Sequence, residues 1–204
     1  MAALNRATFA TAIDDLAGRD PDIGAIVERC GTPPFWSRPQ GFATLVLIVL
    51  EQQVSLASAR ATFDRLLAIL PELSPGAFLR LSDEELRGIG FSRQKTRYTR
   101  EIARAIGDGS LPLARLARRP DESVRSLLTA IKGVGDWTAD VYLMTALRRP
   151  DLWPVGDLAL VRAICEIKQI ESPAPREALL AVGESYRPYR SVAARLYWHH
   201  YLTP

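Results

Sequence analysis

The residues of this chain best suited to chemistry are two glycines, a lysine and an aspartate in its second half. Gly133 and Gly135 stand two positions apart after Lys132, and Asp157 follows them along the chain. Glycine adopts positive φ and lets a partner approach the main chain closely. Asp136 can cap the next helix, whose first amides lie at the positive end of its dipole, so this hairpin is suited to a phosphate. Lys132 would add a cation to the same site.

Each of these residues also has a purely structural interpretation. Two glycines this close together occur in many tight turns between packed helices, and short glycine motifs match many unrelated proteins. Asp157 begins a predicted helix, where an N-cap aspartate stabilises the helix by about 1 kcal/mol. A cap and a catalytic carboxylate are compatible roles, so both interpretations stay open at Asp157.

The elements that must position these residues are helices. Helical periodicity and capping residues recur along the sequence, whereas alternating strand patterns do not, which predicts an all-α fold. Proline and glycine mark most breaks between the helices. We expect helices near residues 4–17, 21–30, 40–53, 56–70, 82–88, 93–107, 121–131, 136–147, 157–169, 175–185 and 189–202.

The composition permits a nucleic-acid partner and argues against several other classes of protein. The net charge of +3 and the pI near 9.1 suit a polyanion, although so small an excess is common. Cys30 and Cys165 are too few for an iron–sulfur cluster and lack C-x-x-C spacing. The apolar run from Phe42 to Leu50 is too short to span a membrane, and the N-terminus lacks a signal core. We therefore expect a cytoplasmic protein, associated with a bacterial nucleoid.

Four separated segments, in order, resemble the helix-hairpin-helix DNA glycosylase superfamily, and within it the bacterial 3-methyladenine DNA glycosylase II type. Their ordered spacing, over nearly the whole chain, is far more specific than any single segment. The segments are Ile48-Val-Leu-Glu-Gln-Gln-Val-Ser55, Gly90-Phe-Ser-Arg-Gln-Lys95, the hairpin with Asp157, and Tyr186-Arg-Pro-Tyr-Arg-Ser-Val-Ala-Ala-Arg-Leu-Tyr-Trp198.

The resemblance implies one glycosylase domain, residues 1–204, built as two helical lobes with the helix-hairpin-helix motif beside a base-binding cleft. One lobe would combine residues about 1–35 with about 151–204, and the other would span about 36–150. The type it resembles also has a β-rich N-terminal lobe, which we do not expect in a chain this short and helical. The implied activity is excision of alkylated purines such as 3-methyladenine from double-stranded DNA in base excision repair, by a monomer.

Asp157 matches the catalytic aspartate of the family. Cleavage of an N-glycosidic bond builds oxocarbenium character on the sugar, which a nearby carboxylate stabilises until water attacks. Bifunctional relatives have a Schiff-base lysine two residues after the second hairpin glycine, where this chain has Trp137. We therefore expect a monofunctional glycosylase without lyase activity.

Trp137 and Trp198 match positions that the family uses in its base pocket. A flipped base needs an aromatic stacking surface, and a cationic base over an indole gains roughly 0.5 to 2 kcal/mol. Ordinary core packing is the alternative for both tryptophans. Val141 and His199 stand where the type it resembles has tyrosines, so the resemblance predicts a differently lined pocket; His199 could bond a base or simply lie on the last helix.

Gln53 matches the position from which the family inserts a wedge into the space left by a flipped nucleotide. Glutamine could fill that space and hydrogen-bond the orphaned base, or it could belong to a polar helix end capped by Ser55. Phe35 and Trp36 are further pocket candidates, and packing of these loop aromatics on a helix is equally compatible with the sequence.

The hairpin carries the remaining implied contacts. Besides Gln53, the residues expected to contact DNA are Lys132, Gly133, Gly135 and Thr138. The family commonly binds a monovalent cation, Na⁺ or K⁺, through main-chain carbonyls, which here would belong to Thr129, Ile131 and Val134. We expect no cofactor for the chemistry and no catalytic metal, because no His, Cys or carboxylate cluster has ligand spacing.

Two other functions stay open. The same aspartate could serve a glycosylase for a deaminated or oxidised base, or the chain could be a non-catalytic protein that binds DNA structures through the hairpin. The presence of Asp157 and both tryptophans favours catalysis, and the formation of abasic sites would separate the two classes.

Overall fold

The computed structural model describes residues 2–203, and within that range the secondary structure is entirely helical, which confirms the all-α prediction. The helices are α1 (Arg6–Arg19), α2 (Pro21–Cys30), α3 (Phe42–Glu51), α4 (Leu56–Ile69), α5 (Pro75–Leu79), α6 (Asp83–Gly88), α7 (Arg93–Gly107), the 3₁₀ helix η1 (Leu113–Arg118), α8 (Asp121–Thr129), α9 (Asp136–Thr145), α10 (Leu158–Lys168), α11 (Arg176–Glu184) and α12 (Arg190–Leu202).

Two of these elements were not predicted from the sequence. Helix α5 and the 3₁₀ helix η1 are each shorter than two full α-helical turns, so neither presents a readable hydrophobic period. The remaining helices occur within two residues of their expected starts, because Ser, Asp and Asn caps mark most of those starts clearly.

The chain divides into two compact units. We call residues 38–142 the middle unit, and residues 2–37 together with 143–203 the terminal unit. Residues 143–150 belong to the terminal unit, where two hydrogen bonds hold them: Leu4 N–H, just before α1, donates to the carbonyl of Arg148 at 2.8 Å, and Arg195 of α12 donates to the carbonyl of Met144 at 2.6 Å.

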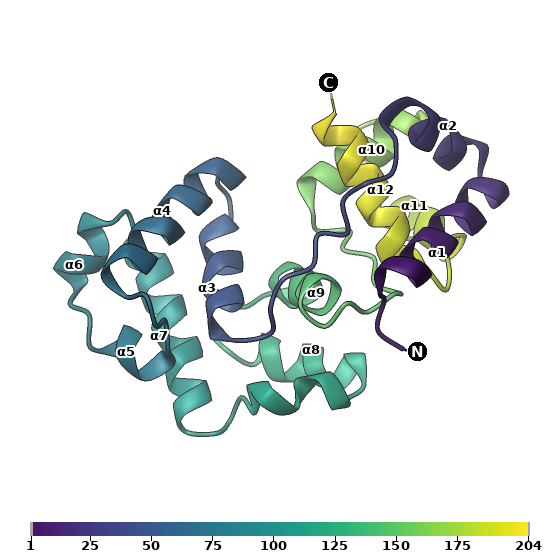
Figure 1. The fold of residues 1–204 in the computed structure, drawn as a ribbon. Coiled ribbons are helices and arrows are strands. Elements are labelled where there is room, and N and C mark those ends of the chain that lie inside the picture. The colour runs from purple at the N-terminus through teal and green to yellow at the C-terminus, as the bar shows by residue number, and fades with distance from the viewer. Residues whose placement is uncertain (1, 204) are drawn as a thin grey trace. The chain divides into compact units, whose positions relative to one another are not determined.

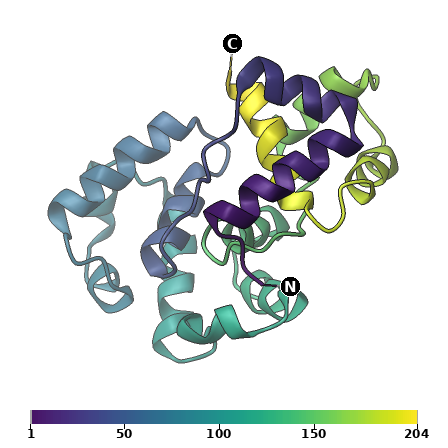
Figure 2. The same ribbon diagram turned by 45° about the vertical axis from the view of Figure 1, so that its right-hand side comes forward.

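Helix α12 forms the centre of the terminal unit. Its residues Val192, Ala193, Leu196 and Tyr197 are fully buried, and helices α1, α2 and α10 pack against it. Figure 2 shows α1 and α2, in dark purple, beside the yellow α12. Since both chain ends contribute helices to one core, this unit forms only when the two ends of the described chain come together.

Arg195 is an unusual member of that core, because its side chain is fully buried. The guanidinium donates to the carbonyls of Ser191 and Met144, and it lies 5.9 Å from the centre of the Phe9 ring. Burial lowers the pKa of Arg195 to about 10, so the group still carries its charge at neutral pH. It therefore binds the carboxyl-terminal turn of α9, where carbonyls attract a cation.

Helix α3 is the core of the middle unit. Seven of its ten residues are buried, among them Leu45, Val46, Ile48 and Val49, and all ten are apolar except Thr44 and Glu51. A helix that is apolar all round must be enclosed by other elements. Helices α4 and α7 pack against it (Figure 1), and α5 and α6 pack on α7.

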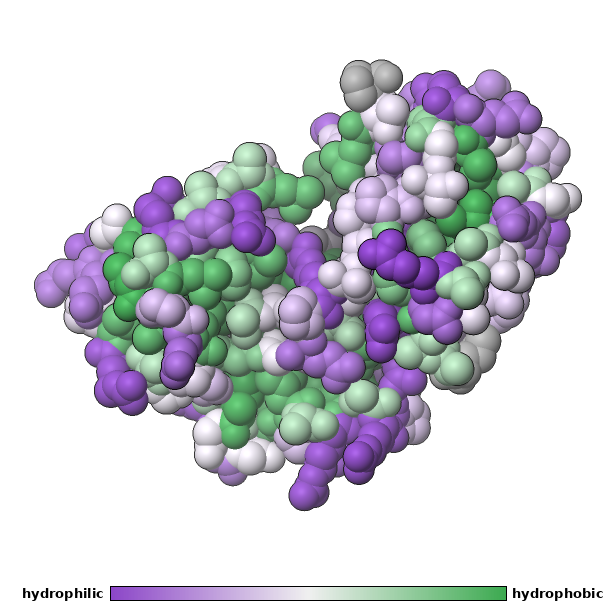
Figure 3. Space-filling model, in the orientation of Figure 1, coloured by the Kyte–Doolittle hydropathy of each residue, from purple (hydrophilic) through white to green (hydrophobic). Residues whose placement is uncertain are grey.

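On the face that Figure 3 shows, hydrophilic residues alternate with hydrophobic ones, and a hydrophobic area lies at the amino-terminal end of α4. Val54 and Leu56 lie there, with 44% and 56% of their surface exposed. None of the helices in the described part of the chain has the length and apolar character needed to cross a membrane.

Candidate functional site

The glycine hairpin connects α8 to α9 in the middle unit. The N–H of Val134 donates to the carbonyl of Ile131 at 3.0 Å, and Gly133 occupies the turn with φ of +93°. The carbonyl of Gly135 accepts the first bond of α9, from Ala139 N–H at 3.0 Å. Gly135 therefore holds the cap position that the sequence suggested for Asp136, which instead is the first residue of the helix.

Gly133 is required for a steric reason as well as for its dihedral angle. A Cβ atom built on this residue would lie only 2.0 Å from Cγ of Tyr98, so the Tyr98 ring lies directly against the hairpin backbone. Tyr98 comes from the second turn of α7. Sequence analysis missed this residue, because nothing in its spacing connects it to a hairpin more than thirty residues later along the chain.

Gln52 joins the end of α3 to the same hairpin. Its Nε2 donates to the carbonyl of Gly133 and to Oγ1 of Thr138, each at 3.0 Å. Thr138 is only 1% exposed. The Thr138 side chain therefore faces the interior, with its hydroxyl held by Gln52, and a contact between Thr138 and DNA stays a prediction.

Gln53 follows at once and has the opposite character. The residue is exposed and adopts a left-handed backbone conformation with φ of +57°. This conformation turns the chain between α3 and α4, so Gln53 is presented to solvent while Gln52 is held inside. The cap of α4 is Ser55, whose hydroxyl accepts a hydrogen bond from the amide of Ser58. Gln53 takes no part in that cap.

The two helices of the hairpin are joined by an ion pair. Arg125 of α8 binds Asp140 of α9, whose side chain is 8% exposed. Although burial by itself lowers the pKa of Arg125, the hydrogen bond and charge of Asp140 raise it overall. The pair holds the two helices together in the middle unit, which keeps the hairpin turn between them in a fixed conformation.

The exposed part of the hairpin is cationic. Lys132 is exposed and forms no ion pair with any residue of the described range 2–203, and Gly135 is exposed beside it. The carbonyls proposed for a monovalent cation are those of Thr129, Ile131 and Val134. Within the described residues only Ile131 accepts a backbone hydrogen bond outside the helices, so the other two retain lone pairs for a cation. This donor set of neutral oxygens suits Na⁺ or K⁺.

Trp137 and Val141 differ in how they are placed on α9. Trp137 lies in the first turn of the helix and is half-buried, whereas Val141 is 5% exposed. Trp137 thus retains indole surface for a ligand beside the hairpin. Val141 contributes to the apolar packing of the middle unit.

Asp157 lies at the start of α10 in the terminal unit. Its Oδ1 accepts the amide of Leu160 at 2.8 Å, so the N-cap interpretation is confirmed by the geometry. The same oxygen accepts the indole N–H of Trp198, from α12, at 2.9 Å. The structure therefore joins the expected catalytic carboxylate directly to one of the two expected base-binding tryptophans.

The segment that leads to Asp157 is held by α12. Arg190 donates from Nε to Oδ1 of Asp151 at 2.8 Å and from Nη2 to Oδ2 at 3.1 Å. Ser191 accepts the amide of Leu152 at 2.9 Å. Because these bonds bind both the side chains and the backbone, the loop before Asp157 cannot shift without breaking several of them.

Trp153 anchors the middle of that segment. Its indole N–H donates to the carbonyl of Leu179 at 2.8 Å, and its ring packs on those of Tyr186 and Tyr197. A Cβ atom on Gly183 would lie 2.4 Å from Trp153 Cδ1, so α11 approaches the ring at van der Waals contact. Sequence analysis did not single out Trp153, because a buried tryptophan beside a proline gives no motif of its own.

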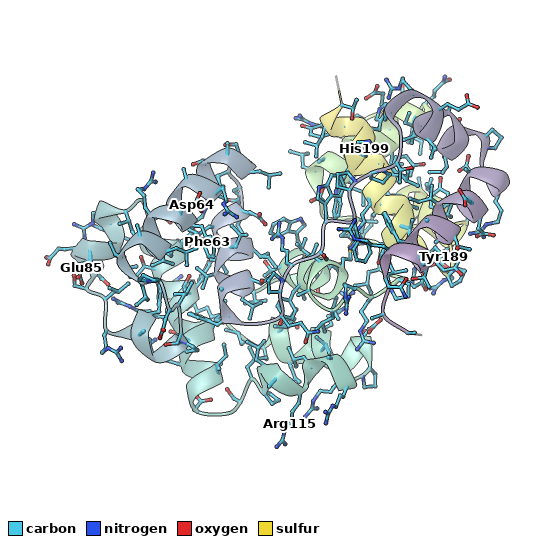
Figure 4. The ribbon with its side chains drawn as sticks, in the orientation of Figure 1. Phe63, Asp64, Glu85, Arg115, Tyr189 and His199 are labelled. Carbon is cyan, nitrogen blue, oxygen red and sulfur yellow. The ribbon has the colours of Figure 1, made fainter. Side chains whose placement is uncertain are left out.

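His199 is the residue after Trp198 on α12, where Figure 4 labels it. Its Nε2 lies 2.8 Å from the carbonyl of Cys30, and its ring packs edge-on against Trp36 at 6.2 Å. Phe35 packs on Phe9 of α1 at 5.1 Å. Phe35 therefore packs on a helix, which was the alternative to a place in the base pocket. His199 links α12 to the end of α2.

The structure thus brings the candidate residues into two groups, one in each unit. In the terminal unit Asp157 and Trp198 are hydrogen-bonded, and in the middle unit the hairpin, Gln52 and Tyr98 are in contact. Within the described residues no three His, Cys, Asp or Glu side chains gather as a metal site would require.

Comparison with known proteins places both groups in one family. The family model described as the HhH-GPD superfamily base excision DNA repair protein matches residues 46–188, which include both the hairpin and Asp157. The chain is 28% identical to YfjP of Bacillus subtilis, provisionally named a DNA-3-methyladenine glycosylase, over 86% of this chain and 64% of that protein. The chain therefore spans less than two thirds of that relative's length.

Solved structures show the same fold over almost the whole chain. A 3-methyladenine DNA glycosylase of Schizosaccharomyces pombe, in complex with abasic DNA, has a TM-score of 0.86 at 28% identity, covering 92% of this chain and 95% of its own. A DNA-3-methyladenine glycosidase from Bacillus halodurans has a TM-score of 0.76 at 30% identity, covering 96% and 89%.

Proposed function

Because the chain belongs to the HhH-GPD superfamily of base excision DNA repair proteins, we propose that it is a monofunctional DNA N-glycosylase that excises alkylated purines from double-stranded DNA. The observation that carries the proposal is the hydrogen bond between Asp157 and Trp198. It places a carboxylate beside an indole, which are the two groups that this reaction needs in one place.

Asp157 stabilises the positive charge of the transition state. As the bond between the sugar C1′ and the base nitrogen breaks, its electron pair leaves with the base, and C1′ gains oxocarbenium character. A carboxylate next to C1′ favours that charge in a site from which water is largely excluded. Oδ1 is held by the amide of Leu160 and by Trp198, so its position is set before the substrate binds.

Water completes the reaction. Its oxygen bonds to C1′ from the open face, and its proton passes to the Asp157 carboxylate or to solvent, which leaves a neutral abasic sugar. An alkylated purine is cationic before cleavage and leaves as a neutral base, so it needs no acid to protonate it. This requirement for only one carboxylate fits the proposed role of Asp157.

The half-buried indole of Trp137 supports the absence of lyase activity. A lyase needs an amine that forms a Schiff base with C1′, and the chain has an indole where bifunctional relatives have that lysine. Lys132 is exposed on the other side of the hairpin glycines. Borohydride should therefore trap no covalent complex between this protein and its product DNA.

The hairpin holds the DNA backbone. The exposed Lys132 and the glycine turn bind one phosphate. The carbonyls of Thr129, Ile131 and Val134 would hold a Na⁺ or K⁺ ion, which would add positive charge beside that phosphate. Exposed Gln53 fills the space left by the flipped nucleotide, with Gln52 fixing the base of its loop on the hairpin. Trp137 in the middle unit and Trp198 in the terminal unit each offer an indole face suited to an alkylated base. The protein acts as a monomer.

Release of methylated bases from alkylated duplex DNA tests the proposal. Asp157→Asn is the matched variant, because asparagine is an equally good N-cap and keeps an oxygen for Leu160 and Trp198. We expect release of 3-methyladenine by the wild-type protein and loss of at least about a hundredfold in the variant. Equal release by both proteins would remove Asp157 from the reaction.

If the wild-type protein releases no methylated base but does release a deaminated or oxidised base, it is a glycosylase for that other lesion. Binding of abasic DNA without release of any base would make the chain a non-catalytic DNA-structure binder. The melting temperatures of the wild-type protein and Asp157→Asn should agree within a few degrees. Such agreement would show that the loss of base release does not come from a loss of folding.

A further inference from the structure

The surface of α7 next to the hairpin carries a group of side chains that the proposed chemistry does not use. They are Gln94, Arg97 and Tyr98, and the Tyr98 ring lies against the backbone of Gly133. We call them, together with Lys132, the α7 cluster. All four residues belong to the middle unit.

The Tyr98 hydroxyl is oriented within a hydrogen-bonded pair. Gln94, one turn earlier on α7, donates from Nε2 to the Tyr98 oxygen at 2.7 Å. A phenol oxygen that already accepts a bond has its own proton available to donate. No described residue between 2 and 203 accepts that proton, so the phenol is left as a donor at the edge of the hairpin.

Arg97 brings a positive charge to the same place. Its guanidinium carbon lies 5.5 Å from the centre of the Tyr98 ring, and the side chain is exposed. The nearest acid along the same face of α7 is Glu101, which is already bound by Arg104 at 2.7 Å. In the described range neither Arg97 nor Lys132 forms an ion pair, so both charges face solvent uncompensated.

The electrostatic state of Tyr98 reflects this surrounding. The hydrogen bond from Gln94, with the charges of Arg97 and Lys132, holds the pKa of Tyr98 below its usual value. The α7 cluster thus presents two cations and a hydroxyl donor, and its four members include no carboxylate to balance the two charges. A phosphate diester has the complementary chemistry, with a single negative charge and oxygens that accept hydrogen bonds.

We propose that Arg97 and the hydroxyl of Tyr98 form a second backbone-phosphate site, on α7, next to the phosphate held by the hairpin and Lys132. This inference rests on the proposed function, because its ligand is the DNA of that reaction. Because the Tyr98 ring packs against Gly133, the α7 site has a fixed position relative to the hairpin site. The two sites can therefore bind two phosphates of the same DNA backbone. Neither contact reads a base.

The test is the salt dependence of binding to a duplex that contains a stable abasic-site analogue, followed by fluorescence anisotropy. Each phosphate contact in duplex DNA contributes about 0.9 to the slope of log affinity against log salt concentration. Arg97→Gln should therefore make that slope shallower by about 0.9. As a result, the ratio of wild-type affinity to variant affinity for the duplex should fall about threefold between about 50 and 200 mM salt. Arg97→Lys should restore the slope.

Tyr98→Phe separates the hydroxyl from the ring. Phenylalanine keeps the packing against Gly133 but cannot donate a hydrogen bond, so we expect affinity to fall by about threefold to tenfold with an unchanged salt slope.

Arg115→Gln is the matched control. Arg115 is exposed on η1, where Figure 4 shows its side chain pointing away from the rest of the middle unit. Helix α7 extends about 15 Å from Arg97 to its end at Gly107, and η1 follows that end. The control removes the same charge, so its slope should remain that of wild type.

The outcomes are distinct. A wild-type slope in Arg97→Gln, or an equal decrease in Arg97→Gln and Arg115→Gln, would overturn the α7 site and leave the glycosylase proposal intact. Failure of the wild-type protein to bind abasic duplex would overturn both proposals at once, before any variant is compared.

Discussion

The indole N–H of Trp198 donates to Asp157 Oδ1 at 2.9 Å, and this same oxygen caps α10 through the amide of Leu160 at 2.8 Å. One carboxylate oxygen is thus held by two donors from different helices. The geometry explains how a single acid can serve both the fold and the reaction. Its second oxygen, Oδ2, takes no part in these two bonds.

Trp198→Phe tests the value of that indole bond. Phenylalanine keeps an aromatic ring for stacking but removes the N–H, so Oδ1 loses one of its two donors. We expect the single-turnover rate of base release to fall about tenfold, the effect of about 1.4 kcal/mol on the barrier. Tyr201→Phe, an aromatic change at a 43% exposed position of the same helix, should leave the rate unchanged. A wild-type rate in Trp198→Phe would mean that the bond has no role in catalysis.

Gly133→Ala should destabilise the middle unit. Alanine at φ of +93° is strained, and its Cβ would collide with Tyr98 Cγ at 2.0 Å. We expect the free energy of unfolding, measured in urea, to drop by at least about 1 to 2 kcal/mol. Gly135→Ala is the comparison, because a Cβ there meets nothing within 4 Å. Equal stability of the two variants would contradict the close approach of Tyr98.

Asp20→Asn should change the acid stability of the terminal unit. Although burial raises the pKa of Asp20, hydrogen bonds from Lys168, Tyr186 and the Asp22 amide outweigh it and lower the pKa below 3.8. A folded pKa below the unfolded value stabilises the protein above about pH 4, and this contribution is lost as the pH falls through the folded pKa. The variant should be less stable at neutral pH and lose less stability on acidification.

Urea unfolding of Asp20→Asn and wild type at several pH values between about 7 and 3 measures this difference. The introduced asparagine would keep the N-cap bond to the amide of Asp22, so helix α2 should remain. Asp14→Asn, which changes an exposed acid of α1, provides the control and should follow the wild-type pH dependence. Parallel curves for Asp20→Asn and wild type would show that the Lys168 contact contributes nothing to stability.

Much of the candidate site could be predicted because its signals are local. Gly133 and Gly135 act through backbone dihedrals, and Asp157 acts as an N-cap through an amide three residues later. Such interactions connect positions within one turn of helix or hairpin. They can be recognised from residue types and spacing without any knowledge of packing.

The contacts that the sequence did not reveal join residues far apart along the chain. Thr138 belongs to a typical hairpin position, but Gln52 of α3 holds its hydroxyl inside the middle unit. Tyr98 and Trp153 gave no motif, because their partners Gly133 and Gly183 lie on other elements. Side-chain direction at these positions depends on which elements pack together.

By itself, the sequence determined the all-helical class, most helix starts, the hairpin and the N-cap role of Asp157, because periodicity, caps and glycine dihedrals are properties of neighbouring residues. Only the tertiary structure decided that Trp198 bonds the Asp157 carboxylate, that Gln52 rather than Gln53 is held by the hairpin, and that Tyr98 closes against Gly133. These contacts arise when helices bury their apolar faces together, and burial selects which distant side chains meet.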